Sequence, residues 1–443
     1  MTTKMSLLTG AAVGVFLASG FAAQAEAKTA HHKAKRADAA AAARAKEAEE
    51  IEYLKAQVAS LTERLNDAEA SQRQVQAQAA QATAQQAQAQ LANEIQTIPT
   101  EVRTQVASAN PKPRPSWADN TSVNGRMYFD LTHVEQKKDG AKIAPTGTGF
   151  DIKRFYVGID HKFNDTWSGN VTTDVQYNSA ESLTQVYIKK AYLQAKLSDA
   201  LIVRAGSADL PWIPLVEETY GYRFVENVLP DRTKFGASAD WGLHVSGKLA
   251  GGLFNYAVSV VDGAGYKNPV RTKTMDIEGR ANLNLDHVVL AIGGYTGKLG
   301  KDVQGGPPTF HNATRWDALA AYVDPRFRLG VEYFAADNWN TVTTAASDKS
   351  DGYSLWGSIN FTPMVSAFAR WDHVKPSKTL KPSEKDNYYN LGLNWEPIKI
   401  VDLALVYKRD KVDNGLFSTS NGTIGGVSQG TYDEVGLFGQ FRW

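Results

Sequence analysis

The sequence predicts an all-β transmembrane barrel of about sixteen antiparallel strands, preceded by an α-helical coiled-coil segment. The first observation is the final stretch, residues 431–443, whose apolar and polar residues alternate: Val435, Leu437, Phe441 and Trp443 against Glu434, Gly436, Gln440 and Arg442. The second is that similar two-faced segments fill the chain from Thr121 onward. The third is that no stretch after the first 27 residues is long and apolar enough to cross a bilayer as a helix. Every backbone polar group needs a partner in lipid, so a membrane chain without such helices must close its strands into a barrel.

Composition places further limits on fold and function. The chain has 443 residues and no cysteine, so if it is exported it needs a source of stability other than disulfides, and a closed sheet provides one. Its 48 Lys and Arg nearly balance its 47 Asp and Glu, so no overall charge attracts nucleic acid. We expect no cofactor and no metal site. His31 and His32 lie in a basic tail, where adjacent histidines are more often solvated than metal-bound.

Residues 1–27 have the pattern of an export signal peptide. A short basic head at Lys4 precedes an apolar run over residues 5–21, and small residues follow as Ala23-Gln24-Ala25 or Ala25-Glu26-Ala27. The alternative is a transmembrane anchor, but the run is at the short end of the ~17 to 25 residues that a spanning helix needs. We therefore expect this segment to be cleaved during export.

Residues 28–98 are predicted to form a periplasmic coiled-coil stalk. Apolar residues recur at alternating spacings of three and four, which is the seam of a left-handed coiled coil: Ile51, Leu54, Val58, Leu61 and Leu65. The alternative is a single solvated helix in a low-complexity tract rich in Ala and Gln. Closely spaced prolines from Pro99 to Pro115 cannot continue a helix, so residues 99–120 are expected to be a semi-rigid linker.

Residues 121–443 are predicted to form the barrel domain. In the first predicted strand Met127, Phe129 and Leu131 occupy one face and Arg126, Tyr128 and Asp130 the other. The alternation recurs between turns rich in Gly, Asn, Asp and Pro. It places strands near residues 124–133, 151–163, 167–178, 185–197, 201–208, 236–249, 253–262, 274–285, 288–297, 314–323, 326–335, 351–361, 364–373, 386–396, 399–409 and 431–443. Their number is even, as in single-chain bacterial barrels.

The predicted connections alternate in length, which orients the barrel. The short turns are Asp324-Pro325, Thr362-Pro363 and Glu396-Pro397-Ile398; the long loops include 298–313, 337–350 and 410–430. Because short turns face the periplasm in such barrels, the stalk and the C-terminus are both expected there. The longest connection, residues 209–235, is unusually apolar and aromatic for an exposed loop. We expect it to fold into the lumen and to set its narrowest point.

The polar face of the predicted strands would line the lumen with charges of both signs. Rings of one sign select ions, so a mixed wall predicts weak selectivity unless the constriction is biased. Any single charge of this kind is more often a solvated residue or part of a salt bridge in the wall. The candidate pore-lining and constriction residues are Arg154, Lys162, Arg204, Glu217, Glu218, Arg223, Glu226, Arg232 and Lys234.

One catalytic pattern occurs in the sequence. Gly426-Val427-Ser428-Gln429-Gly430 fits the G-x-S-x-G pattern of a nucleophile elbow. That elbow needs a strand before it and a helix after it, whereas this pattern lies in a loop before the last predicted strand. We therefore do not expect an enzyme.

Residues 123–443 resemble the phosphate-selective porin O and P family of outer-membrane porins. The resemblance is carried by residues 150–158, 189–193, 203–206 and 224–242. The terminal Phe441-Arg442-Trp443 looks like the recognition signal for barrel assembly, with Phe441 and Trp443 as its aromatic residues. The resemblance implies a homotrimer in outer-membrane lipid with an infolded third loop. The arginine ladder of phosphate-selective members cannot be mapped onto this sequence.

We therefore expect a general or mildly selective porin that passes small hydrophilic solutes and inorganic ions passively. An alternative within the same fold is an anion or phosphate channel that uses Arg154, Arg204, Arg223, Arg232 and Lys234. A second alternative is a structural tether, in which the stalk binds cell-wall polymer and the barrel serves mainly as an anchor.

Overall fold

The computed structural model describes residues 117–178 and 183–443 of the chain. The predicted signal peptide, the coiled-coil stalk with its seam, and the linker up to residue 116 lie outside the described residues. A short 3-10 helix, η1 (Trp117–Asn120), leads into the first strand. In the part of the chain that the structure describes, no helix has both the length and the apolar character needed to cross a bilayer.

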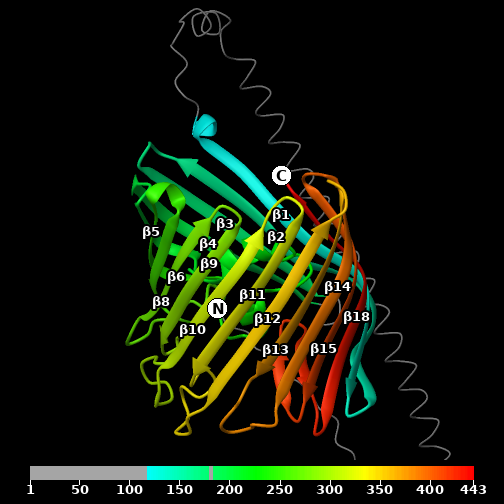
Figure 1. Cartoon of the computed structure of the whole chain (residues 1–443). Coiled ribbons are helices and arrows are strands. Elements are labelled where there is room, and N and C mark those ends of the chain that lie inside the picture. Colours follow the sequence, from blue (N-terminus) through cyan, green and yellow to red (C-terminus); the bar gives the residue numbers. More distant parts are fainter. Residues whose placement is uncertain (1–116, 179–182) are drawn as a thin grey trace, which may run out of the picture. The chain divides into compact units, whose positions relative to one another are not determined.

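The described chain forms a closed antiparallel barrel of sixteen strands, as the sequence predicts (Figure 1). Each strand neighbours the next one in sequence, and β18 lies between β15 and β1. The strands are β1 (Thr121–Lys138), β2 (Ala141–Lys162), β3 (Trp167–Asn178), β4 (Leu183–Ser198), β5 (Leu201–Asp209), β6 (Ala239–Leu249), β7 (Phe254–Val261), β8 (Asp276–Leu285), β9 (Val288–Gly297), β10 (Ala313–Val323), β11 (Phe327–Asp337), β12 (Lys349–Asn360), β13 (Val365–Lys375), β14 (Lys385–Ile398), β15 (Val401–Asp413) and β18 (Gln429–Arg442).

The last strand closes the barrel, which confirms the expectation drawn from residues 431–443. β18 pairs with β1 from Arg126↔Arg442 to Lys138↔Gly430, and with β15 on its other side. Beyond the ladder, the Gly125 amide donates to the Trp443 carbonyl at 3.1 Å and the Trp443 amide donates back at 3.2 Å. The Trp443 ring lies 5.7 Å from that of Phe155 on β2, so the C-terminal residue is tied to the seam by backbone and side chain.

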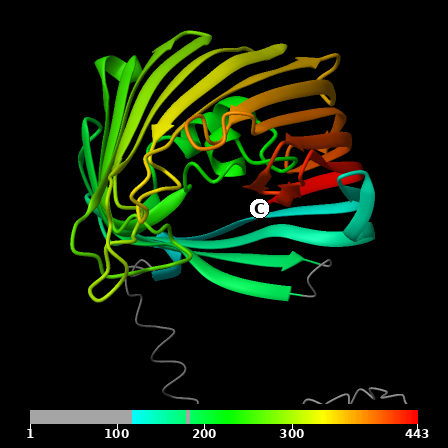
Figure 2. The same ribbon diagram turned by 90° about the horizontal axis from the view of Figure 1, so that it is seen from below.

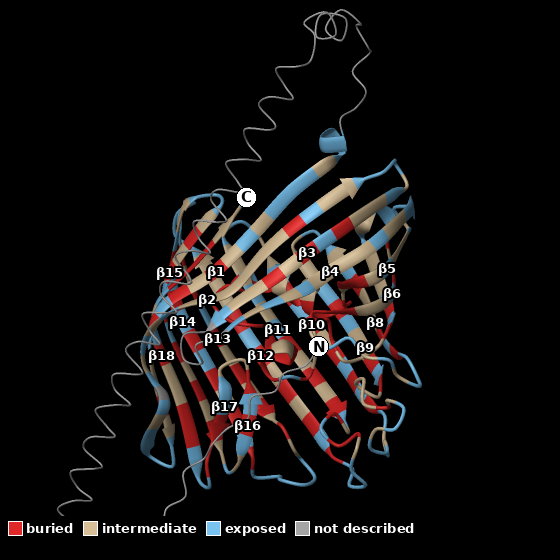
Figure 3. Ribbon diagram, turned by 180° about the vertical axis from the view of Figure 1, so that it is seen from behind, coloured by how far each residue is buried: buried red, intermediate tan, exposed pale blue. Residues whose placement is uncertain are grey.

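Outward-facing residues are apolar around the barrel, and aromatic rings border this apolar surface at both ends. Leu329, Leu355, Leu391 and Leu405 are examples of its exposed aliphatic residues. Exposed and buried positions follow one another along the strands (Figure 3). At the end with long loops the bordering rings include Tyr353, Trp371, Tyr389 and Tyr407; at the end with tight turns they include Phe163, Tyr322, Trp395 and Trp443. Two aromatic girdles around an apolar band are typical of a barrel that crosses a membrane.

Several predicted boundaries are wrong. The first two strands are longer than predicted, since β1 continues to Lys138 and β2 begins at Ala141. β14 continues through Ile398, so the predicted turn Glu396-Pro397-Ile398 lies inside the strand and residues 399–400 make the turn. The proline is accommodated because the register shifts between Trp395 and Ile398, where no ladder bond is required of it. β6 begins only at Ala239, after the long loop. The predicted loop 410–430 is shorter than expected, because β15 continues to Asp413 and β18 begins at Gln429.

The longest connection, residues 210–238, folds into the barrel and is called the inner loop below. It contains two short helices, α3 (Ile213–Tyr220) and α4 (Leu229–Arg232), which the strands enclose (Figure 2). α3 starts near Pro214, which suits a first helical turn, and ends at Gly221 with a left-handed φ of 86°. Its apolar side packs against inward residues of the wall, including Leu319, Trp356 and Phe368. The prediction of an infolded loop is confirmed.

A second element also turns inward. β16 (Leu416–Thr419) and β17 (Gly422–Gly425) form a two-stranded sheet of their own, called the inner hairpin, in the connection from β15 to β18. Phe417 and Ile424 pack with Leu229 and Phe235 of the inner loop in a second apolar cluster. The hairpin therefore lies against the inner loop.

Candidate functional site

The first half of the inner loop is fixed to the wall through Trp212, which is fully buried. Its amide donates to Glu278 Oε1 on β8 at 2.9 Å, and its indole Nε1 donates to Glu332 Oε1 on β11 at 2.8 Å. Arg315 on β10 joins the end of the loop to the same group, since its Nη1 donates to the Phe235 carbonyl at 2.5 Å. A residue buried with both polar groups satisfied holds the loop in one place.

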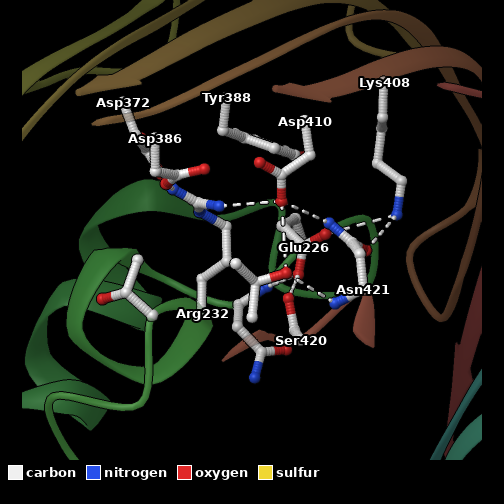
Figure 4. Close-up of polar contacts among 12 residues, drawn as sticks. Glu226, Arg232, Asp372, Asp386, Tyr388, Lys408, Asp410, Ser420 and Asn421 are labelled. Atoms are coloured by element: carbon white, nitrogen blue, oxygen red, sulfur yellow. Dashed lines mark hydrogen bonds and ion pairs between the residues drawn. The ribbon is translucent and has the colours of Figure 1, made fainter. Parts of the chain in front are cut away.

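The second half is held by Arg232 at the end of α4 (Figure 4). Its guanidinium contacts three carboxylates, with Nε at 2.8 Å from Asp372, Nη2 at 2.6 Å from Asp386 and Nη1 at 3.0 Å from Asp410. All four side chains are 0% exposed. The three acids come from the adjacent strands β13, β14 and β15, so one loop arginine joins three strands. The inner hairpin covers this cluster, where the Ser420 amide donates to the Arg232 carbonyl at 2.7 Å.

A further buried ion cluster lies beside Arg232. Lys408 on β15 contacts Glu226 of the inner loop at 3.3 Å and Glu434 on β18 at 2.5 Å. Burial on its own would raise the pKa of Glu226, but Lys408 and Lys153, with hydrogen bonds from Ser420 and the Asn227 amide, lower it overall. The Glu226 carboxylate is therefore charged at neutral pH, and it acts as a partner for the lysines.

The opposite side of the inner loop carries polar groups toward β1 and β2. Arg223 forms an ion pair with Glu217 at 2.5 Å and lies 3.7 Å from Asp231. Its guanidinium is also 5.8 Å from the ring of Tyr128, an inward residue of β1. The loop thus packs its apolar residues and ion clusters on the wall from β8 to β15, and this charged side approaches the wall formed by β1 and β2.

Two β-bulges place extra cations on the inner wall opposite the loop. On β2 the register with β1 passes from Tyr128↔Arg154 to Phe129↔Ile152, which leaves Lys153 unpaired. On β4 the register with β3 passes from Thr172↔Lys190 to Thr173↔Ile188, which leaves Lys189 unpaired. A bulge lets two successive residues point to the same side of a sheet.

The side-chain contacts confirm the inward direction of both bulged lysines. Lys153 Nζ donates to the Val225 carbonyl of the inner loop at 2.7 Å. Lys189 Nζ lies 4.6 Å from the ring of Tyr156, and Arg154 lies 3.8 Å from the buried Asp174. Each bulge therefore adds a lysine to the lumen next to a cation that simple alternation already places there.

A loop residue joins the same wall. Lys267, between β7 and β8, lies 4.5 Å from the ring of Tyr187 and 3.4 Å from Gln176 Oε1. Its neighbour Tyr266 donates a hydrogen bond to Asp174 at 2.5 Å, which fixes the loop on the wall. Lys153, Arg154, Lys189 and Lys267 together are called the basic wall below.

The sequence-predicted pore residues fall into three groups. Arg154, Glu217 and Arg223 lie between the inner loop and the wall of β1 and β2. Glu226 and Arg232 are buried on the side of the loop that packs on the wall, so we assign them to anchoring rather than to lining the lumen. The remaining four lie elsewhere. Lys162 is at the tight-turn end beside Asp165, and Arg204 on β5 contacts Gln194 on the neighbouring strand β4. Glu218 is exposed on α3, and Lys234 is exposed after α4.

Alternation of side chains could not find Lys153 and Lys189, because it assigns both to the lipid face. The signal that would have found them is the pair Lys153-Arg154 and the pair Lys189-Lys190 inside strands. A charged side chain facing the bilayer centre costs about 2 to 4 kcal/mol, so two consecutive cations in a membrane strand favour a bulge.

The G-x-S-x-G pattern does not form a nucleophile elbow. It lies in the connection that enters β18, so a strand follows it and not a helix. Ser428 Oγ donates to Asp139 Oδ1 at 2.9 Å, and Asp139 also accepts from the amides of Val427, Ser428 and Gln429. These amides lower the pKa of Asp139, which keeps its carboxylate charged. Through these hydrogen bonds the turn between β1 and β2 holds the loop that precedes β18.

Comparisons with known proteins agree with this architecture. No protein-family model matches the chain, and no curated protein matches it at a significant level. Among solved structures, the anion-selective porin from Comamonas acidovorans aligns over 73% of this chain and 99% of its own, with 12% identity and a TM-score of 0.55. The barrel has the fold of outer-membrane porins. The outer membrane channel DcaP of Acinetobacter baumannii aligns over 73% of this chain and 97% of its own, with 12% identity and a TM-score of 0.50.

Proposed function

We propose that this protein is an outer-membrane porin that lets small hydrophilic solutes and ions diffuse passively through a water-filled barrel. The observation that carries the proposal is the closed sixteen-strand barrel with an apolar outer band, a charged inner face and an inner loop fixed inside it. The porin fold of two solved structures supports it. The narrowest part would lie between the basic wall and the charged side of the inner loop.

A mild preference for anions is the second candidate function. It is supported by the basic wall, whose four cations face Asp174 on β3 and Asp130 on β1. Other acids near these cations already have partners, Asp209 with Lys190, and Glu226 and Glu434 with Lys408. On the loop side Arg223 is already paired with Glu217. Cations concentrated at a narrow point attract anions and repel cations. The structural likeness to a porin that is named anion-selective is in keeping with this preference.

Planar-bilayer recording of the purified protein tests both proposals. We expect stepwise conductance and, under a potassium chloride gradient, a zero-current potential of the sign that anion preference gives. A chloride current that added phosphate blocks would support the narrower phosphate-selective alternative. A barrel that inserts without conducting would overturn the channel function and leave the tether as the remaining reading.

The anion preference is expected to fall as pH rises from 7 to 9. Burial, with Arg154 close by, lowers the pKa of Lys267 to about 8, so this lysine is charged below pH 8 and neutral above it. Measurement of the zero-current potential across this range checks the prediction. Lys267→Met should start with a smaller preference and show no step near pH 8. An equal step in the variant would contradict the assignment to Lys267.

For residues 1–116 we retain the sequence-based proposals of a signal peptide, a periplasmic coiled-coil stalk and a linker. A homotrimer and a cell-wall partner of the stalk are likewise proposals, supported by the family resemblance and the seam pattern. Deletion of residues 38–98 should loosen attachment of the envelope while leaving conductance unchanged. A normal envelope in the deletion strain would exclude the tether role.

A further inference from the structure

Beyond the aromatic girdle at the long-loop end, one sector of the outer surface carries a row of outward-facing cations. On β13, β14 and β15 the alternation that points Tyr389 and Tyr407 outward continues past these rings. The residues it brings to the surface, called the outer belt below, are Lys375, Lys385, Arg409 and Lys411. Their strands lie side by side in the barrel (Figure 1).

The register places these cations close together. Arg409 is the β15 partner of Tyr389, Lys411 is the partner of Asn387, and Lys385 is the partner of Asp413. Neighbouring strands are about 4.8 Å apart, and side chains two residues apart along a strand are separated by about 7 Å. Lys411 therefore lies roughly 7 to 8 Å from both Lys385 and Arg409, so the three cations can contact one ligand that carries more than one anionic group.

The outer belt has more positive charge than its own acids neutralise. Arg409 pairs with Asp433 at 3.1 Å and Lys411 with Asp413 at 2.9 Å, and the side chains of both cations remain 43% and 35% exposed. Within residues 117–178 and 183–443, Lys375 and Lys385 have no ion-pair partner. Lys385 is exposed and Lys375 half-buried, so unpaired positive charge at this surface favours an external anion.

The other side of the barrel lacks this feature. At the same end of β6 to β11, the outward residues are Trp241, Val260, Ile277, Thr296, Thr314 and Asp337, none of them basic. Outward cations at this end are therefore absent from β6 to β11, so they are not a general consequence of reaching the membrane surface.

We propose that the outer belt binds the phosphate groups of lipid headgroups in the outer leaflet. Aromatic girdles lie at headgroup depth, so cations just beyond one meet the phosphates of the surrounding lipid. Arg409 and the lysines can donate charge-assisted hydrogen bonds to phosphate oxygens, while Trp371 and Tyr389, stacked at 6.4 Å, offer an apolar surface to the acyl region below. The proposal rests on the membrane placement in the proposed function and not on conduction.

Binding by the full-length protein in detergent tests this, with three probes: lipid A, dephosphorylated lipid A and phosphatidylglycerol. The triple variant Lys385→Gln/Arg409→Gln/Lys411→Gln should weaken binding of phosphorylated lipid A at least roughly tenfold. Lys162→Gln/Lys196→Gln/Lys248→Gln, which removes the same charge from exposed residues at the tight-turn end, should change it by less than about twofold. A heat-induced change in electrophoretic mobility equal to that of the parent shows that both variants fold.

The outcomes separate the possible sources of phosphate. Loss of lipid A binding alone identifies the glycolipid as the ligand, and parallel loss of phosphatidylglycerol binding means that any lipid phosphate is recognised. Equal effects of the two triple variants on lipid A binding would overturn the proposal. The same holds if the parent protein binds dephosphorylated lipid A as tightly as lipid A. Conductance of both variants is expected to match the parent, so a failure of the channel function would be seen separately.

Discussion

Replacement of Arg232 by methionine is expected to release the inner loop from the wall. Arg232 is the cation shared by Asp372, Asp386 and Asp410. After its removal Asp372 keeps Arg370 at 2.7 Å, whereas Asp386 and Asp410 retain no ion-pair partner among the described residues. Loss of one partner from a buried ion pair typically costs about 3 to 5 kcal/mol, because the remaining charge stays buried. The variant should unfold at a lower temperature and show larger, noisier conductance.

Thermal unfolding and single-channel recording of the same preparations measure these two effects. Lys234→Met is the matched control, since it removes an exposed cation two residues away. The hydrogen bonds of Lys234 involve its backbone, whose carbonyl accepts from Trp339 Nε1 at 2.9 Å and whose amide donates to the Asp231 carbonyl at 3.4 Å. If the methionine variant does not assemble, Asp386→Asn provides the second test, and it should be milder because it removes an acid while Arg232 keeps two others. An Arg232→Met channel with parental stability and quiet current would show that the ion cluster does not hold the loop.

Reversal of the two bulged lysines, Lys153→Glu/Lys189→Glu, is expected to convert anion preference into cation preference. In water, the Coulomb energy between one unit charge and a monovalent ion about 8 Å away is about 0.5 kcal/mol. The double variant changes the local charge by four units, and screening at 0.1 M salt reduces the sum to about 1 kcal/mol. That energy corresponds to a roughly fivefold change in permeability for each ion, in opposite directions for anions and cations.

The zero-current potential under a potassium chloride gradient measures this reversal. Lys137→Glu/Lys142→Glu provides an equal change of charge at the long-loop ends of β1 and β2, where both side chains are exposed. It should leave the preference nearly unchanged, because charges more than a Debye length from the ion path are largely screened. A potential that stays anion-selective in the bulge variant would place the narrowest point elsewhere in the lumen.

Much of the fold could be predicted from local sequence features. Residues such as Met127, Phe129 and Leu131 alternate with polar residues at the strand period, and each strand repeats this signal independently of the others. The closing role of β18 followed from the same reasoning, because a membrane strand cannot leave its backbone unpaired. The apolar character of the inner loop also predicted that it would be protected.

The lumen was harder to predict, because its chemistry depends on contacts between distant parts of the chain. Arg232 meets acids 140, 154 and 178 residues away, and this pairing turns a candidate pore cation into a buried anchor. Lys153 and Lys189 point inward only because bulges shift the register against β1 and β3.

The sequence by itself therefore determined the barrel, its strand number, its closure and the infolded loop. The physical reason is that period-two patterning, turn residues and backbone satisfaction act within a strand or between neighbours. Only the tertiary structure decided which charges face water, because the inner loop neutralises the acids of one wall and leaves the basic wall opposite it.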